Sequence, residues 1–320
     1  MANGVLVLAE LADGAPAPIT AELVGAAQRL NAGPVSAMLI GSGVEGAAAR
    51  ITGVETVYVV DNPALAEYTN DAYTQAAVAA AQQAEPAVIL LGQTDTGRDL
   101  APALAYKLNT AAAMDTIALE MKDGRLHTTR PAYGGNARAV NSFAAAPAVA
   151  TVRPKSQDAV EGGSAGRVVK VDFAAGAVRS HVTARTVASS EGVRLEDADV
   201  VVTGGRGLGG PEGFQGIEEL AHLLGGAVGA SRAVADLGWR PVAEQVGLTG
   251  KVVSPTIYIA VAVSGASQHM AGCSGSKNII AINKDPEANI FKAARFGIVG
   301  DYKTVLPALI AAVKKAKAGA

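Results

Sequence analysis

The segment Val200-Val-Val-Thr-Gly-Gly-Arg-Gly-Leu-Gly-Gly210 opens the last third of the chain and decides its fold. A run of β-branched residues leads directly into a glycine-rich turn, the pattern of a buried strand followed by a loop. A helical stretch follows at residues 216–224, and then a second strand at residues 227–230. A strand, a crossing helix and another strand predict a parallel βαβ unit.

The same alternation runs through most of the 320 residues. We expect strands at residues 5–8, 35–40, 56–60, 87–91, 256–263, 279–282 and 297–299, and helices at residues 20–30, 71–84, 98–108 and 304–317. A chain of this length suits two domains. The predicted fold class is α/β, with a parallel-sheet, nucleotide-binding-like fold in each domain: an N-terminal scaffold domain (residues 1–190) and a C-terminal domain (residues 195–320).

Two stretches depart from this alternation. Between Asp115 and Val152, glycines punctuate short alternating segments, which predict β-hairpins at a sheet edge. Residues 155–167 are rich in glycine and predict a surface loop or a linker. Thr20 is a candidate cap for the first helix.

Bulk properties exclude several classes of protein. The net charge of −2 argues against nucleic-acid binding. The apolar run Ile257–Val263 is far shorter than the roughly 20 residues of a spanning helix, so we expect no membrane insertion. Cys273 is the only cysteine and no basic leader precedes the first strand, which favours a cytoplasmic setting.

Two glycine loops match the dinucleotide-binding fingerprint. Gly41-Ser-Gly-Val-Glu-Gly46 follows a strand, with Asp61 in the place of a ribose-binding acid. The helical stretch after it is too short for a Rossmann crossover, so we interpret it as a turn in a scaffold. Gly205-Arg-Gly-Leu-Gly-Gly210 carries Arg206 inside the loop, which suits an anionic group close to backbone N–H donors.

Six glycine-containing or polar segments follow strands of the second half. They are Gly204-Gly-Arg-Gly207, Gly229-Ala-Ser-Arg232, Gln245-Val-Gly-Leu-Thr-Gly-Lys251, Ser264-Gly-Ala-Ser-Gln-His269, Ala281-Ile-Asn-Lys-Asp-Pro286 and Gly300-Asp-Tyr302. The carboxyl ends of parallel strands meet at one edge of a sheet, where ligands bind. Six such loops indicate a long nucleotide ligand.

In order and spacing, these segments resemble the alpha subunit of electron-transfer flavoprotein. The resemblance implies one FAD in the second domain, no cofactor in the first, and a beta subunit that carries AMP or a second FAD. It also implies an electron carrier rather than an enzyme with its own substrate, although some members bifurcate electrons from NADH. Family donors are flavin dehydrogenases, commonly the acyl-CoA dehydrogenases of fatty acid β-oxidation, and a common acceptor is a quinone oxidoreductase.

The resemblance also implies roles for individual residues. Thr249 would lie near flavin N5, Arg232 beside the isoalloxazine ring, and His269 near the N1/C2 region. Residues implied at the ribityl and pyrophosphate groups are Ser231, Ser264, Gly265, Ala266, Ser267 and Gln268. Those implied at the pyrophosphate and adenosine end are Arg206, Asn283 and Asp301, and Val246, Gly247, Leu248 and Tyr302 complete the set.

Leu248 departs from the family pattern, which often has glutamine there, so the redox potential of the flavin is the property most affected. Two other functions remain open at this point. The glycine fingerprints fit an NAD-dependent dehydrogenase, and the first domain alone fits a non-redox module that binds an adenine nucleotide. His269, Arg232 and Asn283 also have ordinary structural interpretations, as a buried histidine, a surface charge and a strand end.

Overall fold

The computed structural model describes residues 3–135, 137–186 and 193–319. The chain divides into two compact units, one comprising Met1–Ala132 and Arg138–Thr186 and the other Tyr133–Ala137 and Val187–Ala320. The division that we expect after residue 190 lies outside the described residues, so it stays a prediction.

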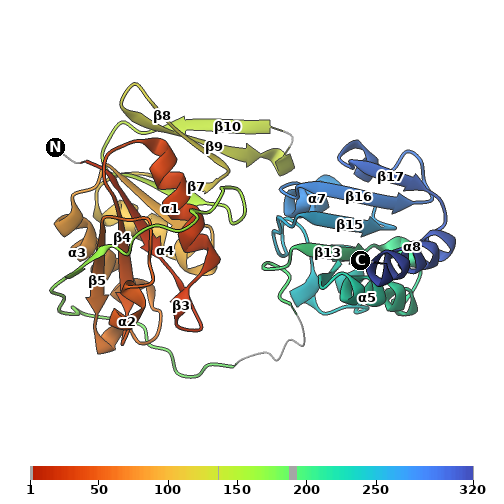
Figure 1. The fold of residues 1–320 in the computed structure, drawn as a ribbon, viewed down its shortest axis with the longest axis horizontal. Helices are drawn as coiled ribbons and strands as arrows, with labels where there is room; N and C mark the ends of the chain where they lie inside the picture. The colour runs from red at the N-terminus through yellow and green to blue at the C-terminus, as the bar shows by residue number, and fades with distance from the viewer. Residues whose placement is uncertain (1–2, 136, 187–192, 320) are drawn as a thin grey trace. The chain divides into compact units, whose positions relative to one another are not determined.

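A seven-stranded parallel sheet forms the centre of the first unit (Figure 1). Its order is β12-β5-β4-β1-β6-β11-β7, with strands β1 (Val5–Ala9), β4 (Val35–Gly41), β5 (Thr56–Asp61), β6 (Val88–Gly92), β7 (Ala112–Thr116), β11 (Ala148–Val152) and β12 (Arg167–Lys170). A small pair, β2 (Leu11–Ala12) and β3 (Ala15–Pro16), follows β1.

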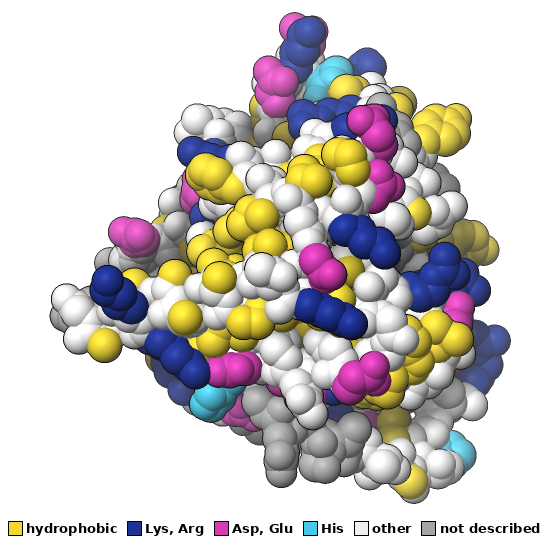
Figure 2. Space-filling model, turned by 90° about the vertical axis from the view of Figure 1, so that its right-hand side faces the viewer, with side chains coloured by type: hydrophobic (Ala, Val, Ile, Leu, Met, Phe, Trp, Pro, Cys, Tyr) yellow, Lys and Arg dark blue, Asp and Glu magenta, His cyan; other side chains and the backbone are white. Residues whose placement is uncertain are grey.

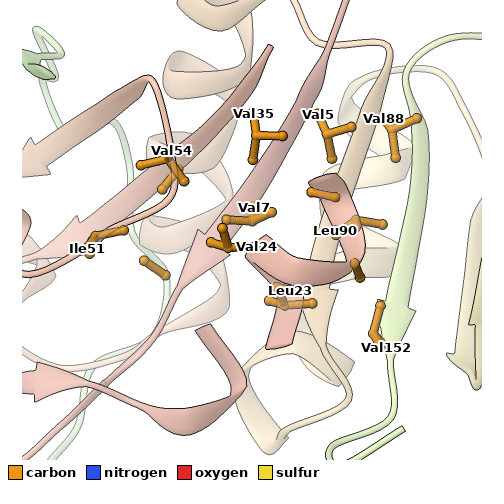
Figure 3. Packing of buried hydrophobic residues seen from close by; sticks show 14 of the residues in the cluster. Val5, Val7, Leu23, Val24, Val35, Ile51, Val54, Val88, Leu90 and Val152 are labelled. Carbon is orange, nitrogen blue, oxygen red and sulfur yellow. The ribbon is translucent and has the colours of Figure 1, made fainter. Parts of the chain in front are cut away.

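Helices cover both faces of this sheet, because its central strands are apolar on both sides. α1 (Pro18–Leu30) and α2 (Glu45–Ala48) lie on one face, and α3 (Asn70–Ala84) and α4 (Asp95–Lys107) on the other. Figure 3 shows Leu23 and Val24 of α1 beside Val7 and Leu90 of the sheet. The predicted α/β fold with a parallel sheet is confirmed, and the expected strands and helices agree with the observed ones to within about three residues.

The region of predicted hairpins is partly confirmed. β8 (Ala118–Lys122), β9 (Arg125–Ala132) and β10 (Ala137–Ser142) form a separate three-stranded sheet, in which β8 and β9 are an antiparallel pair. The expectation was wrong for β11, which lies between β6 and β7 in the large sheet. All five β11 residues are buried, so the strand lacks the alternation of a sheet edge.

One expectation at α1 was wrong, and another was confirmed in one of its two alternatives. The helix begins at Pro18 after Ala17, and the Thr20 hydroxyl instead donates to the Glu10 carbonyl at 3.0 Å. Residues 155–167 form a surface segment, as one interpretation had it, but they do not link the two units. Their backbone binds α1, with Val160 N donating to Ala21 O at 3.0 Å, and the chain then returns to the sheet as β12.

The second unit is built on a five-stranded parallel sheet of order β14-β13-β15-β16-β17. Its strands are β13 (Val200–Gly204), β14 (Ala227–Ala230), β15 (Ile257–Val261), β16 (Asn278–Asn283) and β17 (Phe296–Val299). Helices α5 (Phe214–Leu223), α6 (Arg232–Asp236) and α8 (Tyr302–Ala318) contribute to the core on one face, and α7 (Ser267–Cys273) to the core on the other. The C-terminal doubly wound fold is confirmed.

Figure 2 shows that acidic and basic side chains are intermixed on the face that it draws, with hydrophobic side chains between them. That face has no extended patch of one sign of charge. No helix within the described parts of the chain combines the length and the apolar character needed to cross a bilayer.

Candidate functional site

In the first unit, a side chain of the same unit occupies the backbone donors of the glycine loop at residues 41–46. The Asp61 carboxylate accepts hydrogen bonds from the backbone N–H groups of Gly43 and Val44, both at 2.8 Å, and of Glu45 at 3.2 Å. These are the donors that a pyrophosphate would need. Asp61 therefore acts as the anion of this loop rather than as a ribose-binding acid, and the loop gives no support to the nicotinamide alternative.

The switch point of the first sheet, between β1 and β6, is also filled by internal contacts. Thr94 Oγ1 donates to Glu10 Oε1 at 2.8 Å and accepts from Gly97 N at 3.0 Å. Burial raises the pKa of the Glu10 carboxyl above its usual range, and the Thr94 hydrogen bond offsets part of this rise. Farther along this edge, Arg153 binds Asp115 through two hydrogen bonds of 2.9 and 2.7 Å.

The second unit presents a different edge. Gly204 at the end of β13 is in register with Ala230 of β14 and Val261 of β15, so three loops leave the sheet at one level. The strand order reverses between β13 and β15, which makes this the topological switch point. The prediction that these loops share one edge is confirmed for the loops after β13, β14, β15, β16 and β17.

The β13 loop depends on glycine for a close backbone approach. A Cβ on Gly205 would lie 2.1 Å from the Ala262 carbonyl oxygen, and Gly205 N donates to Val261 O at 2.9 Å. Arg206 then begins a short 3-10 turn and is exposed. None of the described carboxylates pairs with Arg206, so its guanidinium is available to an anion at this edge.

The β14 loop places a second cation at the same edge. Ser231 N donates to Gly204 O at 3.1 Å, and Ser231 precedes the short helix α6. Arg232, the first residue of α6, is exposed and makes only a 3.4 Å contact with the exposed Asp236. Such a pair is weak in water, which leaves the Arg232 charge available.

The segment 245–251 is held between β14 and α7. Val246 N donates to Ala230 O at 2.9 Å, and Leu248 N donates to Gln268 O at 2.7 Å. Gly247 has φ +149, and a Cβ on Gly272 of α7 would lie 2.3 Å from Gly247 N. Glycine at both positions thus allows the segment to pack directly on the helix.

Within this segment, Leu248 and Thr249 point to the surface. Leu248 is 63% exposed, and Thr249 is exposed with its hydroxyl accepting a 3.0 Å hydrogen bond from Gln245 Nε2. The end of the segment is anchored by an ion pair between Lys251 and Glu196, which lies at the start of the second unit.

The β15 loop carries exposed polar residues into α7. Gly265 has φ +78, and a Cβ there would lie 2.2 Å from Ile290 N, which donates to Ser264 O at 3.1 Å. This contact fixes the loop on the segment that follows β16. The residues that it exposes at the sheet edge are Ser264, Ala266, Ser267 and Gln268.

His269 lies behind this exposed edge. It is only 7% exposed, and its Nε2 is 2.9 Å from the hydroxyl of Tyr258 on β15. Burial lowers the pKa of His269 to about 4, and the nearby Val246 backbone offsets this only in part. Nδ1 is buried and has no hydrogen-bond partner among the described residues. The imidazole is therefore neutral at neutral pH.

Three predicted residues at the other end of the edge have structural roles. Asn283 Nδ2 donates to Val263 O at 2.9 Å, and Asn283 Oδ1 accepts from Asp285 N at 3.0 Å. Asp301 caps α8 by accepting from Lys303 N at 2.9 Å, and the Tyr302 hydroxyl donates to Leu208 O at 2.6 Å. The structural interpretation of Asn283 as a strand end thus describes its contacts.

Comparison with known proteins agrees with this arrangement. The model of the electron transfer flavoprotein domain matches residues 5–176, and that of the electron transfer flavoprotein FAD-binding domain matches residues 194–274. The electron transfer flavoprotein subunit alpha of Thermoanaerobacterium thermosaccharolyticum is 43% identical, over 98% of each chain. The chain belongs to the electron-transfer flavoprotein alpha-subunit family. The Bacillus subtilis subunit is 40% identical over 97% of each chain, and protein FixB of Clostridium saccharobutylicum is 42% identical over 98% of this chain and 97% of its own.

The residues present fit the FAD of this family. Arg206 and Arg232 are cations without a strong carboxylate partner among the described residues, which suits a ligand with a pyrophosphate. Gly205 and Gly265 let the loops at this edge pack closely on neighbouring backbone. The buried His269 Nδ1 is an orphan polar atom at the segment 245–251, as expected where a ligand supplies the partner.

Sequence reasoning missed three supporting residues. Gln245 holds the Thr249 hydroxyl, Gly272 allows α7 to approach Gly247, and Tyr258 binds His269. The signal for Tyr258 was present, because it is the one polar ring in the apolar run Ile257–Val263. A phenol at a buried strand position needs a hydrogen-bond partner.

Proposed function

We propose that the chain is the FAD-binding subunit of a heterodimeric carrier that takes electrons from flavin dehydrogenases, such as acyl-CoA dehydrogenases, and passes them to a quinone oxidoreductase or another acceptor. The observation that carries this proposal is the polar edge of the C-terminal sheet, where Arg206, Arg232 and Thr249 are exposed around the switch point. FAD supplies the capacity to take up and release electrons in single steps.

The proposed site assigns each end of the cofactor to part of this edge. Thr249 would lie near flavin N5, Arg232 beside the isoalloxazine ring and His269 near the N1/C2 region. The ribityl and pyrophosphate groups would contact Ser231, Ser264, Gly265, Ala266, Ser267 and Gln268. The pyrophosphate and adenosine end would lie toward Arg206, Asn283 and Asp301, with Tyr302 completing the set. Val246, Gly247 and Leu248 would complete the set within the segment 245–251.

The two groups beside the ring act differently on its charge. The exposed guanidinium of Arg232 stabilises negative charge on the ring as a cation. His269 has a pKa of about 4 before the ligand is considered, so it acts as a neutral hydrogen-bonding group. About 1.4 kcal/mol of differential stabilisation shifts a one-electron potential by roughly 59 mV, so one well-placed charge is enough to tune the carrier.

The proposed partner is a beta subunit that carries AMP or a second FAD. Members of this family normally pair with a beta subunit. Because internal side chains occupy the glycine loop and the switch point of the first unit, we place the second nucleotide in the partner. A cytoplasmic setting is part of the proposal and is supported by the single cysteine, Cys273, whose thiol is buried and has its pKa raised to about 12.

Co-expression with the beta subunit tests the proposal. The purified heterodimer should show a flavin spectrum, with one FAD assigned to this chain after acid release and quantification. AMP in the same preparation indicates a simple carrier, and a second FAD indicates a bifurcating one. A colourless heterodimer that takes up no flavin on reconstitution would contradict the proposal.

A matched pair of arginine variants tests the site itself. Arg206→Ala removes a cation from the proposed pyrophosphate end, and we expect FAD affinity to fall by about tenfold, since a charged hydrogen bond is worth about 1.5–3 kcal/mol. Arg295→Ala is the control, because Arg295 is also exposed but precedes β17 at the opposite edge of the sheet. Equal affinities of the two variants would place the cofactor elsewhere.

A further inference from the structure

A buried polar cluster lies directly behind the exposed edge of the C-terminal sheet. The Tyr258 hydroxyl on β15 is 2.9 Å from His269 Nε2 on α7, and the two ring centroids are 6.2 Å apart. Thr203 and Cys273 lie beside the Tyr258 hydroxyl. All four side chains are buried, so the cluster does not exchange its hydrogen bonds freely with water.

The surroundings of Tyr258 indicate where its proton points. The phenol is completely buried, and burial is the largest cause that raises its pKa well above the ordinary value. Cys273 adds to the rise and the nearby Thr203 hydroxyl opposes it. Thr203 Oγ1 has no partner within hydrogen-bond geometry among the described residues. A phenol is a better hydrogen-bond donor than a neutral imidazole N–H, and an imidazole nitrogen is a better acceptor than a phenol oxygen, so we assign the 2.9 Å contact as Tyr258 O–H donating to His269 Nε2.

The neutral imidazole carries one proton, which lies on either Nδ1 or Nε2. If Tyr258 donates to Nε2, that nitrogen is the acceptor and Nδ1 carries the proton. The Val246 backbone lies beside the ring and offsets part of the fall in the pKa of His269, but it does not meet hydrogen-bond geometry at Nδ1. Nδ1–H is then a buried donor without a partner among the described residues, beside the segment that carries Thr249.

We propose that Tyr258 is a positioning residue for the cofactor: its hydroxyl donates to His269 Nε2 and thereby fixes the proton on Nδ1, which His269 presents to an acceptor atom of the flavin. The inference rests on the proposed function, because it takes His269 as a flavin contact. It adds a residue that does not touch the ligand but determines whether His269 is a donor or an acceptor. A donor there stabilises negative charge on the ring, and an acceptor there does not.

Nitrogen chemical shifts of the histidine ring test this directly. In the ¹⁵N-histidine-labelled heterodimer with FAD bound, His269 is expected in the Nδ1–H form. The labelled Tyr258→Phe variant, which removes one hydroxyl from the same buried ring, should show a mixture of tautomers or the Nε2–H form. Tyr73→Phe is the matched control, because it removes a hydroxyl that binds Leu65 in the first unit.

The one-electron midpoint potential provides a second measurement. Loss of a fixed donor should weaken binding of the reduced relative to the oxidised cofactor by up to about tenfold in Tyr258→Phe, which lowers the potential by up to about 59 mV. Tyr73→Phe should leave the potential unchanged. A purely structural role of Tyr258 would change thermal stability but neither the tautomer nor the potential.

The outcomes separate this inference from the proposed function. FAD bound with His269 in the Nε2–H form in the wild-type protein would overturn the positioning role and leave the proposed function intact. A heterodimer that binds no FAD would overturn both. If Tyr258→Phe does not fold, the wild-type nitrogen shifts alone decide the matter, since the proposal requires the Nδ1–H form.

Discussion

The two glycine loops of this chain have similar sequences and opposite surroundings. In the first unit, the N–H groups that follow Gly41 are held by the Asp61 carboxylate, and the switch point is filled by Glu10 and Thr94. In the second unit, the loop after β13 carries Arg206 to an exposed edge. The difference shows that a glycine fingerprint provides donors, while the rest of the fold determines whether an internal residue or a ligand accepts from them.

The largest expected effect comes from adding one methyl group to the glycine loop of the second unit. Gly205→Ala would place its Cβ 2.1 Å from the Ala262 carbonyl, so the loops after β13 and β15 must separate. We expect a loss of about 1–3 kcal/mol of stability and of most bound FAD, measured by denaturant unfolding and flavin content.

Gly46→Ala is the matched change in the first loop, where a Cβ would meet open space. It should alter stability by no more than about 0.5 kcal/mol and leave flavin content unchanged. Equal effects of the two substitutions would remove the distinction between the loops.

Removing the Asp61 carboxylate tests whether it stabilises the glycine loop of the first unit. Asp61→Ala leaves three backbone N–H groups without the acceptor that they have now, and we expect a loss of about 2 kcal/mol at unchanged FAD stoichiometry. Thermal unfolding in phosphate and in chloride should show that phosphate restores part of this stability. An unchanged melting temperature would contradict the role assigned to Asp61.

A buried carboxyl makes the first unit sensitive to pH. Burial is the largest cause that raises the pKa of Glu22 to about 7, while the Lys155 backbone N–H, which binds it at 2.6 Å, opposes the rise. The folded state therefore holds this proton more tightly than the unfolded chain, whose pKa is near 4.5. Its contribution to stability is greatest at low pH and declines as the pH rises from about 4.5 through about 7.

Glu22→Gln removes this dependence. We expect the variant to be more stable than wild type by on the order of 1 kcal/mol at pH 8 and nearly equal to it at pH 4.5. Urea unfolding at the two pH values measures the difference. Greater stabilisation at the lower pH would reverse the assigned sign.

The exposed edge should respond in redox potential rather than in stability. Arg232→Ala removes the cation proposed beside the ring, so the one-electron potential should fall by roughly 30–60 mV. Stability should change little, because the Arg232–Asp236 contact is exposed at 3.4 Å. Spectroelectrochemical titration of the heterodimer gives the value, and a potential equal to that of wild type would move Arg232 away from the flavin.

The smallest expected effect concerns Leu248, which is 63% exposed. Leu248→Gln places a hydrogen-bonding group at this exposed position, where the family resemblance predicts one, and we expect the potential to rise by roughly 10–30 mV with stability unchanged. Leu237→Gln is a suitable control, because Leu237 is 54% exposed just after α6. A shift of similar size in both variants would indicate a nonspecific effect.

Sequence reasoning located the strands and the polar edge of the C-terminal sheet because both leave local signals. Buried parallel strands are continuous apolar runs, and the loops after them gather glycine and short polar residues. The position of β11 left no such signal, because strand order depends on where the chain returns after the hairpins. Asp61 was noticed for its spacing, but its contact with the loop depends on the three-dimensional path of β5.

The burial of His269 also could not be predicted from the pattern of neighbouring residues. Ser267, Gln268 and His269 are consecutive, yet the first two are exposed and the third is buried, because α7 begins at Ser267 and turns His269 toward β15. The local sequence does not show which face of a seven-residue helix is buried. The role of Tyr258 follows from that packing and could not be assigned before it.

The unpaired nitrogen of His269 should affect the abundance of the protein in a cell. A buried donor without an acceptor costs about 1–3 kcal/mol, so a newly made chain that has not met its cofactor is expected to unfold more often than a loaded one. Proteases and chaperones act on the unfolded population, and differences of this size change abundance several-fold. The amount of this subunit should therefore follow the supply of riboflavin as well as the transcription of its gene.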